Sequence, residues 1–457
     1  MDTVRINEND NVCVDLVTGH KIALCDIENG ADVIKYGYPI GYATAKIQKG
    51  DGVHSHNMKT HLGDILSYEY EPDFDVHTPK EPFTINAYIR DNGDIGIRND
   101  IWIIPTVGCV NSIAKNLAEK TGAICFSHPY GCSQLGDDMR VTQLVLKGLI
   151  NHPNAGGVLV LGLGCENNNI QAMKKNLGTW NENRVKFLSV QDCEDEITEG
   201  ITIIEELKGT ASKDKRKEVP VSKLKIGLKC GGSDGFSGIT ANAVVGKVTD
   251  EICAMGGIAV LTEVPEMFGA ETVLFKRCVS EDVFNKGVNL INNFKKYFKN
   301  HGEKVSENPS PGNKEGGITT LEEKSLGCVQ KGGTAPIVDV LDYGDVVTKP
   351  GLNLLNGPGN DIVSVTNLSA AGCHLVLFTT GRGTPLGGAV PTIKIASNDT
   401  IALKKSHWID FSAYGFDKEE KAQELLALIK RIADGELTKN ETLGNREIAI
   451  FKDGVTL

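Results

Sequence analysis

Two histidines separated by one residue, His54 and His56, stand in the stretch "GVHSHN". If this stretch is a strand, both side chains project from the same face and their imidazoles converge on one point. Imidazole ligates metals and titrates near neutral pH, so the pair suits metal binding, anion binding or proton transfer. The competing interpretation is a polar turn that happens to be rich in histidine.

The stretch "TEVPEMFGAE" (262–271) places three carboxylates, Glu263, Glu266 and Glu271, at the predicted end of a strand. Carboxylates in such a position can ligate a divalent metal or act as a general base. We take Glu263 as the candidate for both roles. At least one of the three is expected to be a solvated residue at the start of a helix.

The loop "KCGGSDGFSG" (229–238) contains four glycines, which let the backbone approach a ligand and present N–H groups to an anion. Lys229 adds positive charge, and Ser233 and Asp234 add polar groups, so the loop predicts binding of an anion such as a sugar acid. The loops "GLNLLNGPGND" and "TGRGTPLGG" are of the same kind. Asn353 and Arg382 are their candidates for substrate binding, because a guanidinium can hold a carboxylate at two points.

Half of the twelve cysteines stand next to a glycine. A small apolar residue packs well beside a tight turn, which explains any one of them. The recurrence indicates a set of turns that could present thiolates to a metal. No Cys-x-x-Cys pair occurs, which argues against a zinc ribbon or a thioredoxin-type site. The cysteines next to glycine are Cys109, Cys132, Cys165, Cys230, Cys328 and Cys373.

The elements that must position these residues indicate an α/β protein. Short alternating segments in residues 12–70 predict a small β domain, and the proline-rich, acidic stretch 70–83 predicts a linker. From residue 84 onward, continuous apolar runs followed by Gly-rich loops and helices predict two α/β domains with mainly parallel sheets. Residues 209–223 are charged and predict a second linker. The predicted domains are 1–75, 76–220 and 221–457, with ligands and all Gly–Cys loops at the carboxyl ends of strands.

The formal net charge of −11 argues against nucleic acid and anionic membranes as partners, although a local positive patch can still bind a small anion. The N-terminal stretch has no basic and apolar signal pattern, and no apolar run has the length of a membrane helix. We therefore expect a cytoplasmic protein.

Many segments together resemble the altronate/galactarate dehydratase family from about residue 10 to the C-terminus. The resemblance implies an N-terminal SAF-type β-clip domain and an Fe²⁺- or Mn²⁺-dependent lyase of hexuronate catabolism. The implied reaction is dehydration of D-altronate to 2-dehydro-3-deoxy-D-gluconate, and we also expect a homo-oligomer. The segments include "DVIKYGYPIGYATA", "VHSHN", "WIIPTVGCVN", "SHPYGCSQLGDD", "VLGLGCENN", "CGGSDGFSGITAN", "TEVPEMFGAE", "NPSPGNKEGGITTLEEKSLGC" and "REIAIFKDGVTL".

Such a reaction needs a base for the C2 proton, an acid for the departing 3-hydroxyl and a cation for the developing negative charge. Two kinds of metal site remain open. One is a mononuclear ion held by His54, His56 and Glu263, which the expected chelation of a sugar acid favours. The other is an iron–sulfur cluster held by some of Cys132, Cys165, Cys230 and Cys328. The catalytic candidates are His54, His56, Glu263 and Asp234, and the substrate-binding candidates are Lys229, Ser233, Asn353 and Arg382.

Alternative functions are dehydration of galactarate or another sugar acid, and elimination of sulfite from a sulfonated hydroxy acid. Both begin with the same proton abstraction. A sugar-acid-binding protein without activity is a further alternative, which the many polar loops disfavour.

Overall fold

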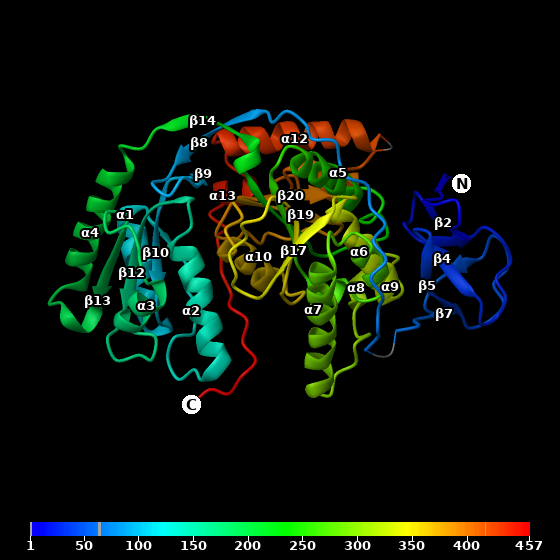
Figure 1. Ribbon diagram of the computed structural model, residues 1–457, viewed down its shortest axis with the longest axis horizontal. Coiled ribbons are helices and arrows are strands. Elements are labelled where there is room, and N and C mark those ends of the chain that lie inside the picture. The colour runs from blue at the N-terminus through cyan, green and yellow to red at the C-terminus, as the bar shows by residue number, and fades with distance from the viewer. Residues whose placement is uncertain (1, 63–64, 416) are drawn as a thin grey trace.

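The computed structural model describes residues 2–62, 65–415 and 417–457. A small β domain (blue) and an α/β domain (cyan to green) lie at opposite ends of a larger third domain (Figure 1). The predicted class, a small β domain followed by α/β domains with mainly parallel sheets, is confirmed. Within the described residues, no helix is both long and apolar enough to cross a membrane.

The N-terminal domain consists of two small antiparallel sheets, ordered β1-β2-β3-β6 and β4-β5-β7. Alternating residues such as Val12, Val33 and Ile40 are buried between them. The seven strands are β1 (Thr3–Val4), β2 (Val12–Asp15), β3 (Lys21–Ala23), β4 (Asp32–Lys35), β5 (Tyr38–Ala43), β6 (Gly52–Val53) and β7 (Met58–Lys59).

The segment 65–83 contains no helix or strand, as the sequence predicted for 70–83. It runs along the third domain, where the backbone N–H of Asp73 donates to Lys276 O and that of Lys80 donates to Ala254 O.

The second domain has a parallel sheet ordered β11-β10-β12-β13. Every residue of β12 is buried, as its continuous apolar sequence predicted. Its strands and helices are β10 (Asp100–Pro105), α1 (Asn111–Thr121), β11 (Ile124–Cys125), α2 (Gly136–Ile150), β12 (Ala155–Gly162), α3 (Ile170–Leu177), β13 (Val185–Ser189) and α4 (Glu196–Ala211).

The predicted linker 209–223 is wrong in part. The helix α4 continues to Ala211, and β14 (Arg216–Pro220) pairs antiparallel with β8 (Thr84–Ile89) in a sheet ordered β14-β8-β9, with β9 at Ile95–Gly96. Since β14 is an edge strand in which only Val219 is buried, its charged residues can stay in water.

The third domain has a seven-stranded parallel sheet ordered β17-β18-β16-β15-β19-β20-β21. From central β15 the chain first builds one side of the sheet and then the other, which creates a crevice at the carboxyl ends of β15 and its neighbours. The strands are β15 (Lys225–Cys230), β16 (Ile258–Leu261), β17 (Ile337–Leu341), β18 (Gly351–Leu355), β19 (Leu375–Thr380), β20 (Thr392–Ala396) and β21 (Phe411–Ser412).

Helices cover both faces of this sheet. The helices α5 and α12 pack on one face, while α10 packs on the other and also contacts α2 of the second domain. A Cβ at Gly148 of α2 would lie 2.2 Å from Ala370 O of α10, so glycine permits this close contact. The helices are α5 (Ala241–Ala254), α6 (Glu271–Phe275), α7 (Glu281–Asn300), α8 (Pro311–Glu315), α9 (Leu321–Cys328), α10 (Asp361–Ala370), α11 (Asp399–Lys404), α12 (Lys418–Asp434) and α13 (Lys439–Thr442).

The expectation that all Gly–Cys loops lie at the carboxyl ends of strands is wrong for two cysteines. Cys328 is the last residue of helix α9, and Cys373 precedes β19 and so lies at the amino end of that strand. A glycine before a cysteine also suits a helix or the turn that follows one, which sequence spacing does not distinguish.

Candidate functional site

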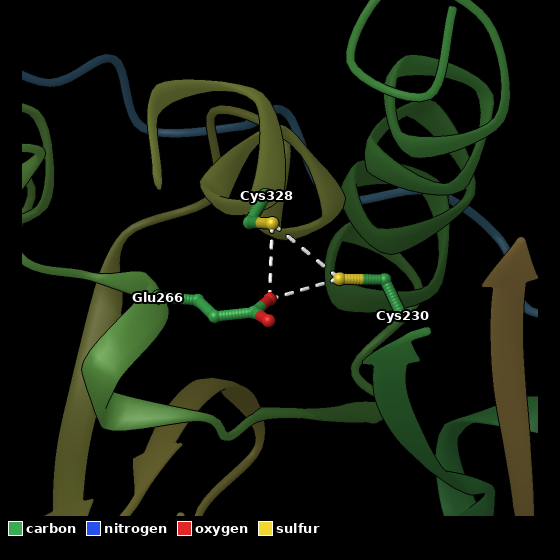
Figure 2. Close-up of side chains that lie close together, drawn as sticks. All are labelled: Cys230, Glu266 and Cys328. Carbon is green, nitrogen blue, oxygen red and sulfur yellow. Dashed lines mark hydrogen bonds between the residues drawn. The ribbon is translucent and has the colours of Figure 1, made fainter. Parts of the chain in front are cut away.

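Three buried side chains meet at the carboxyl edge of the third-domain sheet (Figure 2). The Sγ atoms of Cys230 and Cys328 each lie 3.0 Å from Oε2 of Glu266 and 3.4 Å from one another. Cys230 ends β15, Glu266 ends the short helix Val264–Glu266 after β16, and Cys328 ends α9. Three segments that are distant in the sequence thus supply one set of potential ligand atoms.

The turn after β16 aims Glu266 at the cysteines. Glu263 begins this turn with φ 75° and ψ 62°, the left-handed region that non-glycine residues seldom adopt. The backbone N–H of Val264 donates to Gly357 O at 2.9 Å, which ties the turn to the loop after β18. A strained backbone held at the carboxyl end of a strand is a common feature of functional sites.

Three lysines surround this set. The Nζ of Lys331 lies 2.9 Å from Sγ of Cys230, and the Nζ of Lys324 lies 2.9 Å from Oε1 of Glu266. Lys229 pairs with Glu263 and, at 2.9 Å, with Oδ1 of Asp361. The three ammonium groups therefore face the carboxylates and sulfurs at short range. The contact with Cys230 and burial nevertheless raise the pKa of the Cys328 thiol well above its usual range, so this thiol would lose its proton only to a bound cation.

The two glutamates have opposite pKa shifts. Burial and the negative charge of Glu266 raise the pKa of Glu263 above its usual range, and the nearby Lys229 and Lys331 only partly oppose this. Burial also disfavours the charged form of Glu266, but Lys324, Lys229 and Lys331 outweigh it and hold the pKa of Glu266 well below its usual range. Carboxyls in such different environments suit different roles, one as a proton-transferring group and the other as a permanent anion.

The donor atoms fit a thiophilic divalent cation. A tetrahedral ion with bonds of about 2.3 Å holds two sulfur ligands ~3.8 Å apart, so Cys230, Glu266 and Cys328 are close enough to share one ion. Two sulfurs and one oxygen suit iron(II) or zinc(II) better than manganese(II), which prefers oxygen ligands. Among the described residues, no other three His, Cys, Asp or Glu side chains bring ligand atoms within 4.8 Å of one another.

The N-terminal domain covers one side of this site. Its Lys21 and Lys35 each place Nζ 2.8 Å from a carboxylate oxygen of Glu323 on α9, and all three side chains are buried. A cavity of about 10 Å³, enough for roughly one water, lies between the domains. Lys35 and Tyr36 line it from the N-terminal domain, and Lys324 and Cys328 line it from the third domain.

The proposed strand through the histidine pair is wrong. Strand β6 ends at Val53, and residues 54–57 form a turn in which Asn57 N–H donates to His54 O and Asn57 Oδ1 accepts from His54 N–H. His54 Nε2 lies 2.9 Å from Lys314 O, whereas His56 is exposed. The two imidazoles therefore do not form a joint site with Glu263 in the part of the chain that the structure describes.

The loop residues have structural hydrogen bonds. The buried carboxylate of Asp234 accepts from Ser237, Ser397 and Asn398, which fixes the loop after β15. Arg382 is half exposed, and its Nη1 lies 3.1 Å from Gly312 O and 3.0 Å from Glu315 Oε2.

The other predicted substrate-binding residues are buried. Ser233 O accepts from Asn313 Nδ2 at 2.8 Å. The Nδ2 of Asn353, within β18, donates to Lys349 O and Gly351 O, while its Oδ1 has no hydrogen-bond partner. Their assignment to substrate binding stays a prediction.

The four cysteines proposed for an iron–sulfur cluster lie in two places. Cys230 and Cys328 are buried in the third domain, whereas Cys132 and Cys165 are exposed on the second domain. The sequence predicted a cluster held by some of these four cysteines, and that assignment stays a prediction. The expectation of a solvated glutamate in 262–271 is wrong, because Glu271 is buried against Lys295 at 2.7 Å, like the other two carboxylates.

Sequence reasoning gave no role to Lys324, Lys331, Asp361 and Glu323. The Gly–Cys step at 327–328 was a usable signal for Cys328. The lysines carried none, because a lysine in a helical segment is ordinarily solvated.

Three family models together match most of the chain. The SAF domain of altronate/galactarate dehydratases matches residues 2–61, the second domain of D-galactarate dehydratase/altronate hydrolase matches 87–212, and the D-galactarate/altronate dehydratase C-terminal domain matches 221–456.

Curated relatives match nearly the whole length. The chain is 52% identical to altronate dehydratase of Escherichia coli (strain K12), over 97% of this chain and 93% of that protein. It is equally identical, with the same coverage, to altronate dehydratase of Bacillus subtilis (strain 168). It is 32% identical to galactarate dehydratase (L-threo-forming) of Escherichia coli (strain K12), over 86% of this chain and 79% of that protein.

Proposed function

The chain belongs to the altronate/galactarate dehydratase family, and from this premise we propose that it is a metal-dependent hydro-lyase that dehydrates D-altronate. The product is 2-dehydro-3-deoxy-D-gluconate, formed by loss of the C2 proton and the 3-hydroxyl. The higher identity to altronate dehydratases than to a galactarate dehydratase supports altronate as the substrate. The single observation that carries the chemistry is the buried Cys230–Glu266–Cys328 set with its three lysines.

In this proposal Cys230, Glu266 and Cys328 hold one Fe²⁺. The two sulfur ligands make Mn²⁺ the poorer fit, although the family resemblance implied either ion. A divalent ion held by these residues would supply Lewis-acid chemistry, which makes a proton beside a carboxylate more acidic.

Glu263 is the proposed base for that proton. Its raised pKa gives it the basicity that a proton-abstracting carboxylate needs near neutral pH. Lys229 holds this carboxylate in place, and the backbone N–H of Cys230 donates to Glu263 Oε2 at 3.0 Å. The carboxylate of Glu263 is thus held at the end of the strand that carries Cys230. A base in a fixed position next to the metal site needs less reorganisation before it reacts.

Lys324 and Lys331 are proposed to stabilise the negative charge that develops on the substrate. Lys324 also lines the cavity beside Cys328, so its ammonium can approach the departing 3-hydroxyl and donate a proton to it. Because this cavity has room for about one water, substrate entry requires the N-terminal domain to move away from α9.

The test is keto-acid formation from D-altronate, with galactarate as the competing substrate, by anaerobically purified chain with added Fe²⁺. We expect turnover of altronate in preference to galactarate. We further expect Cys328→Ser and Glu266→Gln to lose both iron and activity. Cys278→Ser is the matched control, because Cys278 is equally buried in the same domain and is not part of the ligand set.

Iron-independent turnover would refute the metal role, and full activity of both ligand variants would refute this site. Formation of keto acid from neither sugar acid would favour a binding protein.

A further inference from the structure

Three of the four exposed cysteines belong to the second domain. Cys109 follows β10, Cys132 follows β11 and Cys165 follows β12, so each stands at the carboxyl end of one of three adjacent parallel strands. Cysteine is among the residue types most often buried, and an exposed free thiol is a liability. Three at one edge of a sheet need an explanation that a packing role does not give.

Hydrogen bonds hold the three loops against one another. The backbone N–H of Gly108 donates to Tyr130 O at 2.9 Å, and that of Asn168 donates to Gly131 O at 3.0 Å. The N–H of Ser133 donates to Asn167 Oδ1 at 2.9 Å. The loop that carries Cys132 therefore contacts both of the other cysteine loops.

The side chain of Glu166 fixes the Cys165 loop by hydrogen bonds. This buried carboxylate accepts from Thr106 Oγ1 at 2.7 Å and from the backbone N–H groups of Leu163 and Gly164. A Cβ at Gly131 would lie 2.0 Å from Thr106 O, so only glycine fits directly before Cys132. These loops are built to fixed positions, with their thiols left at the surface.

A helix begins shortly after each of the three cysteines. The helices α1, α2 and α3 begin at Asn111, Gly136 and Ile170, within five residues after the respective cysteines. Each cysteine is therefore followed closely in the chain by the N-terminus of a helix, the positive end of its dipole. Gln191 Nε2 also donates to Cys165 Sγ at 3.6 Å, the kind of contact that tunes metal-bound sulfur.

The three sulfurs are too far apart in this arrangement to bind one tetrahedral metal ion together. Such an ion needs its sulfur ligands ~3.8 Å apart, whereas the three sulfurs do not all lie within 4.8 Å of one another. An iron–sulfur cluster is several atoms across and accepts thiolates that are farther apart.

We propose that Cys109, Cys132 and Cys165 bind an iron–sulfur cluster at the carboxyl edge of the second-domain sheet. The site is separate from the Cys230–Glu266–Cys328 set and independent of the dehydratase proposal. Three thiols lose their protons to solvent when they bind the cluster. Because the protein offers three thiolates at an exposed edge, at least one iron keeps a position for a small oxygen ligand from solution.

The test is anaerobic reconstitution of the full chain with ferric iron, sulfide and a thiol reductant, which reduces part of the iron, followed by iron and acid-labile sulfide analysis per chain. We expect stoichiometric labile sulfide in the wild-type chain and in Cys328→Ser. The triple variant Cys109→Ser/Cys132→Ser/Cys165→Ser should lose it at least tenfold. Cys25→Ser, which changes the fourth exposed cysteine, is the control and should retain it.

Because the changed side chains are exposed, the triple variant should unfold at the wild-type temperature. Labile sulfide retained in the folded triple variant, absent from the reconstituted wild-type chain, or lost in Cys328→Ser would overturn the proposal. So would binding of zinc without any uptake of sulfide.

Discussion

The ion-paired carboxylate of Glu323 holds the N-terminal domain over the candidate site, and its removal is a sharp test of that arrangement. Burial alone disfavours its charge, but Lys21 and Lys35 outweigh burial and hold the pKa of Glu323 at about 2, against 4.5 for an ordinary glutamate. At 1.36 kcal/mol for each pH unit, this difference corresponds to ~3 kcal/mol. Loss of one partner from a buried ion pair costs a similar amount, about 3–5 kcal/mol.

We therefore expect Glu323→Gln to weaken docking of the N-terminal domain by ~3 kcal/mol. Amide hydrogen exchange at Lys21–Ala23 and at residues 317–320 should then become roughly 100-fold faster. Glu28→Gln is the control, because Glu28 pairs with Lys46 on the exposed surface and such pairs contribute about 0–1 kcal/mol. Unchanged exchange at the domain contact, or an equal increase throughout the second domain, would refute the reasoning.

The same cluster predicts a pH dependence of docking. Burial and the charge of Lys35 lower the pKa of Lys21 to about 8, although Glu323 acts in the opposite direction. Because the unfolded lysine keeps its proton up to its usual pKa of 10.5, the undocked state binds more protons between about pH 8 and 10.5. Docking of the N-terminal domain should therefore strengthen as the pH rises from about 8 to 10.5. The Glu323 carboxylate contributes its stabilisation above about pH 4.5 and loses it as pH falls through about 2.

Four further outcomes test the site. Glu263→Gln should lower kcat at least ~100-fold while iron content stays, whereas Glu266→Gln should lose iron, as metal analysis beside turnover will show. His56→Ala should leave turnover within about twofold in steady-state assays, because the side chain is exposed. Asp234→Asn should lower the free energy of unfolding by about 1–3 kcal/mol in denaturant titrations, because it weakens a buried hydrogen-bond network. After removal of metal by a chelator, Fe²⁺ should restore activity better than Mn²⁺, because two of the proposed ligands are sulfurs.

The hydrophobic pattern predicted the architecture because buried parallel strands require continuous apolar sequence, as in β12 and β19. It failed for β14, whose charged residues are tolerated at a sheet edge. It also failed at His54, where the side chain of Asn57 closes a turn that ends the strand. Local turn chemistry therefore outweighed the two-residue period, and a stretch of six residues was too short to reveal this.

The candidate site was less predictable because its parts meet only through tertiary packing. Cys230 and Glu263 stood out as polar residues at the ends of strands, where α/β proteins place ligands. Lys331 and Glu323 stand in segments whose sequence resembles an ordinary solvated helix. Glu323 is buried because α9 packs against the N-terminal domain, and Lys331, in the short helix after α9, is buried because it reaches Cys230 and Glu263; no local pattern contains these contacts.

The charge of the assembled site explains why buried cysteines and lysines occur together. With both thiols protonated and the carboxylates ionised, five lysines exceed four carboxylates by one positive charge. Ionisation of both thiols changes the net charge of the site to −1. The proposed divalent ion raises this net charge to +1, and a sugar-acid anion then brings it to zero. Since unbalanced buried charge is costly, the site is balanced only when the proposed cation and a sugar-acid anion are bound together. The groups counted are Lys21, Lys35, Lys229, Lys324, Lys331, Glu263, Glu266, Glu323, Asp361, Cys230 and Cys328.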